Sequence, residues 1–179
     1  MKSIFLILAI TIATLTGVST QNIDKHTSIM LTDSYGDTSN LDLAQATGPM
    51  LFVIYGPGCG ICLKELKAIA IKIKSWEQLY NVKLIAFSRK YRKDYSRQIS
   101  KSKEKTELNF PLYIDVNGDI ADYLYDAPGI DTSYFSHING LHLKIPQTII
   151  LSKDKKVLFQ KYGYQIGDEE KIEAILKKP

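Results

Sequence analysis

The chain has 179 residues, of which 45% are hydrophobic and 23% are charged, and its formal net charge is +4. A chain of this length holds one domain with a sizeable core and leaves no room for a second. The net charge is modest, so composition alone gives no indication of a strongly acidic partner such as nucleic acid.

Residues 1–20 have the layout of a secretory signal peptide: Lys2, then an apolar run, then small and hydroxyl-bearing residues. The run is too short to span a bilayer, and no later segment approaches the roughly 20 apolar residues of a transmembrane helix. We expect a signal peptide over residues 1–20, one domain over residues 21–179, and export to a bacterial periplasm or cell envelope. After signal removal we expect no transmembrane segment and no nucleic-acid partner. The usual Ala-x-Ala cleavage motif is missing, so an uncleaved anchor is the alternative.

Residues 50–55 form a continuous apolar run between two Gly-Pro pairs, which is typical of a strand buried on both faces. From about Gly60 to Tyr80, apolar residues recur every three or four positions and predict an amphipathic helix. A second buried strand is predicted over residues 82–88.

Residues 89–105 carry eight basic and two acidic residues. A polar helix is predicted over residues 91–105. Such a run is usually a solvated helix face, and the alternative is a docking patch for an acidic partner or for anionic head groups.

The last third of the chain continues the alternation. A short extended piece, a turn at Asn117-Gly118 and a helix from about Asp119 are expected. Two strand patterns joined by residues 152–155 predict a hairpin, and an amphipathic helix over residues 168–176 follows. Strands that alternate with helices and end in a hairpin and a helix predict an α/β sandwich with a mixed sheet.

The only two cysteines, Cys59 and Cys62, lie three positions apart at the predicted strand-to-helix turn. A purely structural disulfide between them would close a very small loop and remove little entropy from the unfolded chain. A zinc site that adds His137 and His142 is the next alternative. However, roughly 75 residues separate the two pairs, whereas compact zinc modules need about a dozen.

The redox interpretation uses the local features of the pair. Cys59 stands at the helix N-terminus, where free N–H groups and the helix dipole stabilise a thiolate, so we expect it to be the nucleophile. Cys62 is close enough to attack a mixed disulfide and release the product. Glu65 lies at the margin of the apolar stripe with no basic partner on its own helix. We expect it to be partly buried and to relay protons to and from Cys62, the alternative being a solvated glutamate without a role.

These features, with the downstream stretches "IPQTIIL" and "KDKKVLFQKYGY", resemble the thioredoxin superfamily, and within it the TlpA/ResA branch of exported thiol-disulfide oxidoreductases. The resemblance covers residues 28–177 and implies a thioredoxin-like three-layer sandwich with a central mixed β-sheet flanked by helices. It implies that Pro146, preceded by Ile145, is a cis-proline that faces the cysteines, and that the backbone there binds the substrate chain. Tyr55 matches an aromatic residue of the family and is expected at the substrate site.

The chain departs from the family pattern in three places. Gly58 replaces the tryptophan that many relatives have before the first cysteine, and the dipeptide Gly60-Ile61 lacks the proline common there. Because this dipeptide influences the reduction potential, the direction of electron flow is left open. The segment formed by residues 127–144, before Pro146, is longer than expected. We expect it to lie beside the active site and to form a partner-specific wall.

The resemblance implies an enzyme that reduces disulfides of exported client proteins, with apocytochrome c as a frequent client in the family. We expect no cofactor beyond the redox-active Cys59–Cys62 disulfide and no bound metal. The expected partners are client proteins with cysteines or disulfides and an upstream thiol electron donor, and the expected state is a monomer.

Two other functions are alternatives. A peroxiredoxin-like peroxidase needs a Pro-x-x-x-Thr/Ser-x-x-Cys run, and Gly48-Pro49-Met50 lies too far before Cys59 and offers no such threonine. A metal-binding chaperone of this fold would hold copper or zinc through the cysteines and a histidine. Copper-carrying relatives typically have a CxxxC spacing, and the two-residue gap here counts against that function.

Overall fold

The computed structural model describes residues 28–43, 45–89, 94–136 and 141–178, so the expected signal peptide lies outside the described residues. Within them, a seven-stranded mixed sheet has the order β2-β1-β5-β4-β3-β8-β9. β4 is parallel to both of its neighbours, β3 and β5, and the other pairs are antiparallel. The strands are β1 (Ser28–Asp33), β2 (Thr38–Asp42), β3 (Met50–Ile54), β4 (Lys83–Arg89), β5 (Leu112–Asp115), β8 (Gln147–Leu151) and β9 (Val157–Tyr162).

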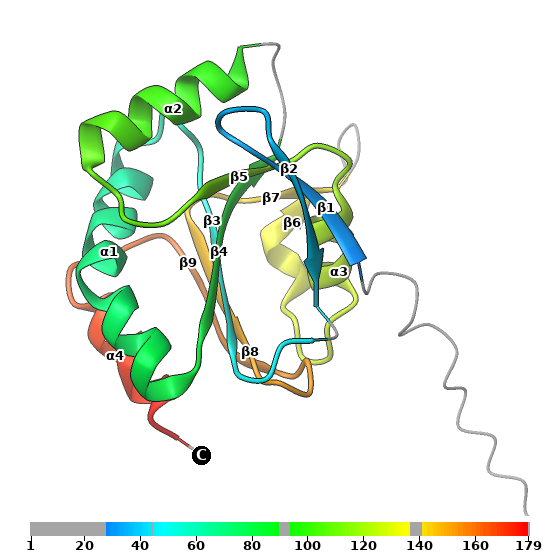
Figure 1. Cartoon of the computed structure of the whole chain (residues 1–179). Helices are drawn as coiled ribbons and strands as arrows, with labels where there is room; N and C mark the ends of the chain where they lie inside the picture. The colour runs from blue at the N-terminus through cyan, green and yellow to red at the C-terminus, as the bar shows by residue number, and fades with distance from the viewer. Residues whose placement is uncertain (1–27, 44, 90–93, 137–140, 179) are drawn as a thin grey trace, which may run out of the picture.

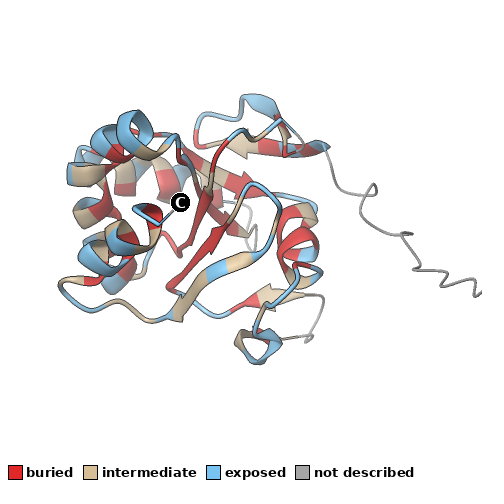
Figure 2. Cartoon of the chain, turned by 90° about the horizontal axis from the view of Figure 1, so that it is seen from below, coloured by how far each residue is buried: buried red, intermediate tan, exposed pale blue. Residues whose placement is uncertain are grey.

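Helices cover both faces of this sheet (Figure 1). One face packs against α1, α2 and α4, and the other against α3 and the small hairpin β6–β7. The buried residues, red in Figure 2, run through the sheet between these layers. The three-layer sandwich with a central mixed sheet is thus confirmed. The covering elements are α1 (Gly60–Tyr80), α2 (Tyr95–Thr106), α3 (Asp119–Tyr125), the 3-10 turn η2 (Thr132–Tyr134), β6 (Phe135–Ser136), β7 (His142–Leu143) and α4 (Asp168–Leu176).

The two central strands β3 and β8 bring distant parts of the chain together. Every residue of both strands is buried, because each has a strand on both sides and a covering layer on both faces. They are antiparallel, and Val53 pairs with Thr148 and Ile54 with Gln147. The end of β3, which leads to the cysteines, therefore lies beside the start of β8, which follows Pro146.

Most predicted boundaries are confirmed. Helix α1 begins at Gly60, α3 begins at Asp119, and α4 spans Asp168–Leu176. Helix α2 begins at Tyr95 rather than at residue 91, and residues 91–93 of the expected helix lie outside the described residues.

The hairpin β1–β2 was missed in the sequence. β1 pairs with β2 on one side and with β5 on the other. It buries Ile29 and Leu31, whereas Met30 between them is 54% exposed. The carboxylate of Asp33 accepts a hydrogen bond from the N–H of Tyr35 at 2.8 Å and stabilises the turn. This alternation of buried and exposed positions was the available signal, but it is short and ends in polar residues.

The segment expected as a wall contributes mainly to the core. Phe135 and Leu143 are buried in the cluster on the α3 face, and their strands pair with each other. Residues 137–140 lie outside the described residues. The described part of residues 127–144 therefore packs chiefly on the face opposite α1.

Candidate active site

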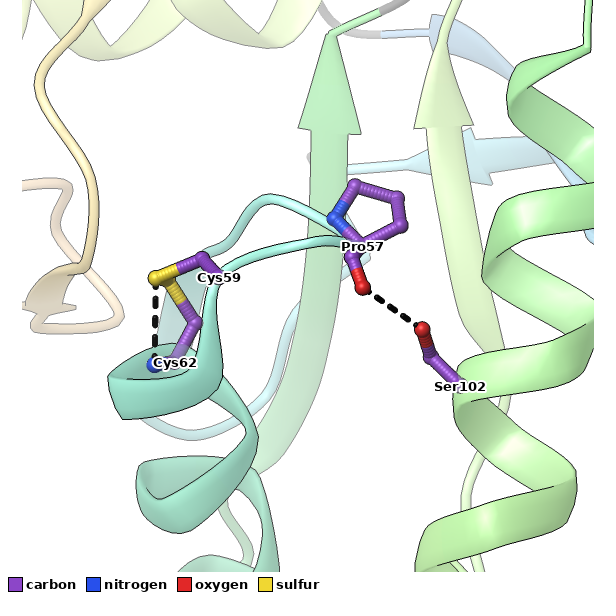
Figure 3. The surroundings of a disulfide bond; sticks show 4 residues. All are labelled: Pro57, Cys59, Cys62 and Ser102. Carbon is purple, nitrogen blue, oxygen red and sulfur yellow. Dashed lines mark hydrogen bonds between the residues drawn. A yellow bond between two sulfur atoms is a disulfide. The ribbon is translucent and has the colours of Figure 1, made fainter.

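The two cysteines lie where the chain passes from β3 into α1. Cys59 is the N-cap residue of α1, and its Sγ accepts a hydrogen bond from the N–H of Cys62 at 3.2 Å. A disulfide joins the two sulfur atoms at the start of the helix (Figure 3). The first turn of α1 contains no acidic residue, so no carboxylate there offsets the positive end of the helix dipole. The surroundings of Cys59 therefore favour a thiolate when the pair is reduced.

The two sulfur-bearing residues differ in exposure. Cys59 is partly exposed, whereas Cys62 is completely buried at 0%. A sulfur atom of another protein can reach Cys59 only, and Cys62 is placed to attack Cys59 from the protein side. This asymmetry matches the roles predicted for a nucleophilic and a resolving thiol.

Glu65 lies one helical turn beyond Cys62 and is more buried than the sequence suggested. Its side chain is only 3% exposed, so the alternative of a solvated glutamate is wrong. The hydroxyl of Thr148 on β8 donates a hydrogen bond to Glu65 Oε1 at 2.5 Å, while Oε2 has no hydrogen-bond partner among the described residues. Burial raises the pKa of Glu65 to about 7, although the hydrogen bond from Thr148 acts in the opposite direction. Near neutral pH this carboxyl group can both accept and release a proton.

An ion pair from other elements acts on Glu65 electrostatically. Lys161 on β9 pairs with Asp168, the first residue of α4. The negative charge of Asp168 raises the pKa of Glu65, and the positive charge of Lys161 lowers it. Burial of Asp168 favours its neutral form, but hydrogen bonds from Lys161 and from the N–H of Gln165 hold its pKa below the usual value. Asp168 is therefore ionised at the pH where Glu65 titrates.

Ile145 and Pro146 lie against the loop that carries Cys59. Their peptide bond is cis, as the family resemblance implies. A Cβ atom added to Gly56 would lie 2.6 Å from Cδ1 of Ile145 and 3.6 Å from Cβ of Cys59. Ile145 is 39% exposed. It thus combines contact with the loop before Cys59 with access to solvent, and a side chain at Gly56 would require the end of the Ile145 side chain to shift.

Tyr55 requires a correction. It was expected at the substrate site, but it is 1% exposed and belongs to the core cluster that also contains Cys62 and Leu66. Burial raises the pKa of Tyr55 above its ordinary value, so its hydroxyl group stays protonated. Tyr55 packs in the core against the same cluster as Cys62 and is not accessible to a substrate.

An apolar depression borders the cysteines on the side of α4. Its lining combines the start of α1 with the chain between β9 and α4, and Ile61 and Ile166 in it are 45% and 93% exposed. Exposed apolar side chains beside a partly exposed sulfur provide a contact surface for a polypeptide. The lining residues are Gly60, Ile61, Lys64, Tyr164 and Ile166.

The remaining sequence expectations concern metals and membranes. In the described residues, no group of three or more His, Cys, Asp or Glu side chains is gathered as a metal site would require. His142 begins β7, and His137 lies outside the described residues. Across the same described ranges, no helix combines the length and the apolar character needed to cross a bilayer.

With this geometry in place, the sequence is found to match the AhpC/TSA family over residues 24–160. The chain belongs to the AhpC/TSA family. No curated protein has a matching sequence.

Three solved structures resemble this AhpC/TSA chain in fold. StoA from Bacillus subtilis is 14% identical with a TM-score of 0.58, and the match covers 82% of this chain and 96% of StoA. A secreted Mycobacterium tuberculosis disulfide oxidoreductase homologous to E. coli DsbE is 14% identical with a TM-score of 0.56, and the match covers 86% of this chain and 97% of that protein. Peroxidoxin BcpB from Mycobacterium tuberculosis is 18% identical with a TM-score of 0.60, and the match covers 84% of this chain and 92% of BcpB. The thioredoxin-like fold is confirmed, and with the Cys59–Cys62 disulfide it identifies a redox enzyme of the thioredoxin superfamily.

Sequence reasoning missed three contributors to the site of this AhpC/TSA protein. Thr148 donates a hydrogen bond to Glu65, a contact that nothing in the sequence indicated. The Lys161–Asp168 pair was not expected near Glu65. The pattern located the cysteines at the strand-to-helix turn and Glu65 one turn beyond Cys62, and the resemblance implied the cis peptide bond before Pro146. Neither contained a signal for contacts between elements far apart in the chain.

Proposed function

We propose that this protein is an exported thiol-disulfide oxidoreductase of the TlpA/ResA type that reduces disulfides in client proteins of the cell envelope. The observation that carries the proposal is the asymmetry of the pair: Cys59 is partly exposed at a helix N-terminus, and Cys62 is buried behind it next to Glu65. An attacking thiol needs access and a stabilised thiolate, and a resolving thiol needs only to reach its partner.

The reaction is two successive exchanges. The thiolate of Cys59 attacks one sulfur of a client disulfide, a mixed disulfide forms, and the second client sulfur leaves as a thiolate. Cys62 then loses its proton and attacks Cys59 Sγ, which closes the Cys59–Cys62 disulfide and releases the first client sulfur. Two electrons pass from the protein to the client, and a dithiol donor must reduce Cys59–Cys62 again.

Glu65 provides the proton-transfer group for the second exchange. In a helix, side chains three positions apart lie on the same face, so Glu65 neighbours Cys62. Its pKa of about 7, raised by burial, means that near neutral pH about half of the molecules hold the carboxylate that can accept the Cys62 proton. The proton returns to Cys62 when the donor reduces the disulfide.

The client contacts follow from the surface around Cys59. The backbone beside Ile145 and Pro146 is the proposed pairing site for an extended client segment. The exposed side chains of Ile61, Ile145 and Ile166 provide apolar contacts for the same client segment. Exported clients with haem-binding cysteines are one class that would need such a reductant.

A peroxidase is the second candidate, because the AhpC/TSA match and the similarity to peroxidoxin BcpB favour it. The peroxidase motif requires a hydroxyl residue three positions before the reactive cysteine, and Gly56 stands there. A Cβ atom at that position would lie 2.6 Å from Cδ1 of Ile145, so a serine or threonine would also require that side chain to shift. The peroxidase reaction therefore lacks its expected hydrogen-bond donor.

One single-turnover experiment compares the two candidates. Fully reduced protein is mixed with a peptide disulfide or with hydrogen peroxide, free thiols are alkylated, and the Cys59–Cys62 state is read by mass spectrometry. We expect faster oxidation by the peptide disulfide, with a mixed disulfide on Cys59 as the first product. Faster oxidation by peroxide, with a sulfenic acid on Cys59, would favour the peroxidase.

Equilibration with glutathione then gives the direction of electron flow. A reduction potential near that of thioredoxin, roughly −270 mV, supports the proposed reductase, whereas a value near −120 mV indicates an oxidase.

A further inference from the structure

A second groove borders the cysteines on the side opposite the apolar depression. It has a volume of about 330 Å³ and lies between the cysteine-bearing segment and α2. Gly58 and Gly60, the two neighbours of Cys59 in the chain, form part of its lining. A polypeptide that presents a sulfur to Cys59 therefore also passes the rim of this groove. The full lining is Pro57, Gly58, Gly60, Leu63, Gln98, Lys101, Ser102 and Lys105.

One face of α2 forms the outer wall of the groove. Gln98, Lys101, Ser102 and Lys105 are spaced by three, one and three positions and so share one side of the helix. The hydroxyl of Ser102 donates a hydrogen bond to the carbonyl oxygen of Pro57 at 2.7 Å (Figure 3). This buried contact fixes α2, and with it the two lysines, relative to the loop that carries Cys59.

The groove is positively charged. Lys101 and Lys105 are its only charged lining residues, both are exposed, and neither forms an ion pair within the described part of the chain. Neither acidic residue of this region, Asp94 or Glu104, lines the groove. Asp94, at the start of α2, accepts a hydrogen bond from the side-chain amide of the lining residue Gln98, and Glu104, three positions after Lys101, accepts one from Ser100.

The two flanks of Cys59 thus differ in chemistry. The α4 side exposes two large apolar side chains, Ile61 and Ile166, and a single lysine, Lys64. The α2 side offers two lysine ammonium groups and no carboxylate. Since positive charge at the rim of a binding surface selects partners of opposite charge, the α2 side favours carboxylates.

We propose that the groove formed by Lys101 and Lys105 is a specificity site for client polypeptides that carry acidic side chains next to their reactive cysteine. This inference rests on the proposed oxidoreductase function and names its client class. The acidic side chains dock against α2 while the client sulfur meets Cys59. This surface increases the rate of productive encounter and leaves the exchange chemistry unchanged.

The kinetic test uses three disulfide substrates, and each rate is divided by the rate of the same substrate with dithiothreitol, which corrects for different reactivity at the sulfur. Two are symmetrical disulfides of a short peptide, with aspartate or with lysine flanking the cysteine, and the third is neutral bis(2-hydroxyethyl) disulfide. Each is mixed with fully reduced protein, which yields the Cys59–Cys62 disulfide and two substrate thiols. We expect the aspartate peptide to be reduced about tenfold faster than the lysine peptide at low salt, with the difference shrinking as ionic strength rises.

Charge reversal identifies the groove. In the Lys101→Glu/Lys105→Glu variant the preference should disappear or invert, while the rate with the neutral disulfide stays unchanged. The matched control is Lys153→Glu/Lys156→Glu, which changes the net charge equally in the turn at the far end of β8. This control should keep the wild-type preference. A preference that survives in the groove variant, or that both variants lose equally, would overturn the proposal.

A binding measurement keeps this inference separate from the redox proposal. The oxidised protein is titrated with fluorescent peptides of the same two sequences in which serine replaces cysteine. Tighter binding of the acidic peptide, lost only in the groove variant, supports the site even if the reduced protein reduces no disulfide, an outcome that would refute the oxidoreductase alone. Equal binding of both peptides refutes the site, as does lysine-dependent binding to anionic phospholipid vesicles without any peptide preference.

Discussion

The hydroxyl group of Thr148 on β8 donates a hydrogen bond to the buried carboxyl group of Glu65 on α1, with 2.5 Å between the oxygens. This contact joins the central sheet to the helix that starts at the cysteines. It also acts on the protonation of Glu65, because a donor to the carboxylate stabilises the charged form against the effect of burial. The proton balance next to Cys62 therefore depends on a residue from the other end of the chain.

The roles of the two cysteines are tested by trapping. In Cys62→Ser the mixed disulfide on Cys59 has no resolving thiol, so covalent complexes with a client should accumulate. In Cys59→Ser none should form, since Cys62 is completely buried. Non-reducing electrophoresis and mass spectrometry with a disulfide-containing client measure this. Equal trapping by both variants would contradict the assigned roles.

Glu65→Gln should slow resolution of the mixed disulfide. Glutamine occupies the same volume but cannot accept the Cys62 proton, and general-base assistance typically contributes 10²–10⁴-fold. In the wild type the resolution rate should rise with pH through about 7, because deprotonated Glu65 is the active form. Stopped-flow measurements from pH 5 to 9 would show this rise as an inflection in the resolution rate. If the inflection persists in Glu65→Gln, it belongs to another titrating group.

Thr148→Val tests the contact between the two residues. Valine keeps the shape of threonine but cannot donate a hydrogen bond, so the pKa of Glu65 should rise, by about one unit. The inflection of the resolution rate should move up with it while the rate at high pH stays near that of the wild type. An unchanged inflection would show that the hydrogen bond does not stabilise the carboxylate.

The buried carboxyl group also makes stability depend on pH. Glu65 has a folded-state pKa of about 7 against 4.5 for an ordinary glutamate, so between these values the folded protein holds more protons than the unfolded chain. The contribution of Glu65 to the free energy of unfolding is therefore fully present below pH 4.5 and is lost as pH rises to about 7. Glu65→Gln removes this loss. At pH 8 its free energy of unfolding should therefore exceed that of the wild type by on the order of 3 kcal/mol.

Urea unfolding of both proteins at pH 5 and pH 8 measures the difference. Asp115, whose pKa burial raises to about 6, titrates in both proteins and cancels in the comparison. A gap between the two proteins that is the same at both pH values would contradict an ionising, buried Glu65.

Ser102→Ala should lower the free energy of unfolding by about 1 to 2 kcal/mol. It removes the buried hydrogen bond to the Pro57 carbonyl oxygen and leaves that oxygen without its hydroxyl partner. Ser100→Ala on the same helix is the control, because among the described residues its hydroxyl bonds only the exposed side chain of Glu104, at 3.4 Å. Urea unfolding should show almost no change for the control, and equal losses in both variants would argue against a special role for the Ser102 contact.

The fold class and the redox pair could be predicted from the sequence because both depend on local patterns. Apolar runs and helical periodicity located β3, α1 and β8, and the two cysteines at the strand-to-helix turn indicated the chemistry. The edge hairpin β1–β2 was missed because its strands are short and largely exposed, so neither carries a strong apolar pattern.

The burial of Glu65 shows where a pattern within one helix stops being informative. On α1 alone the residue lies at the margin of the apolar stripe. Its actual environment includes Thr148 on β8, Lys161 on β9 and Asp168 on α4. Tyr55 is the converse case: family resemblance suggested a surface role, but packing between the sheet and α1 buries it.

The antiparallel pairing of β3 with β8 has a consequence for the order in which the protein is made. Synthesis delivers both cysteines and Glu65 long before Thr148 and the strand that carries it. A chain that has emerged only as far as α1 holds reactive thiols without the donor that sets the protonation of Glu65. The hydrogen bond from Thr148 to Glu65 can therefore form only after β8, near the C-terminus, has paired with β3.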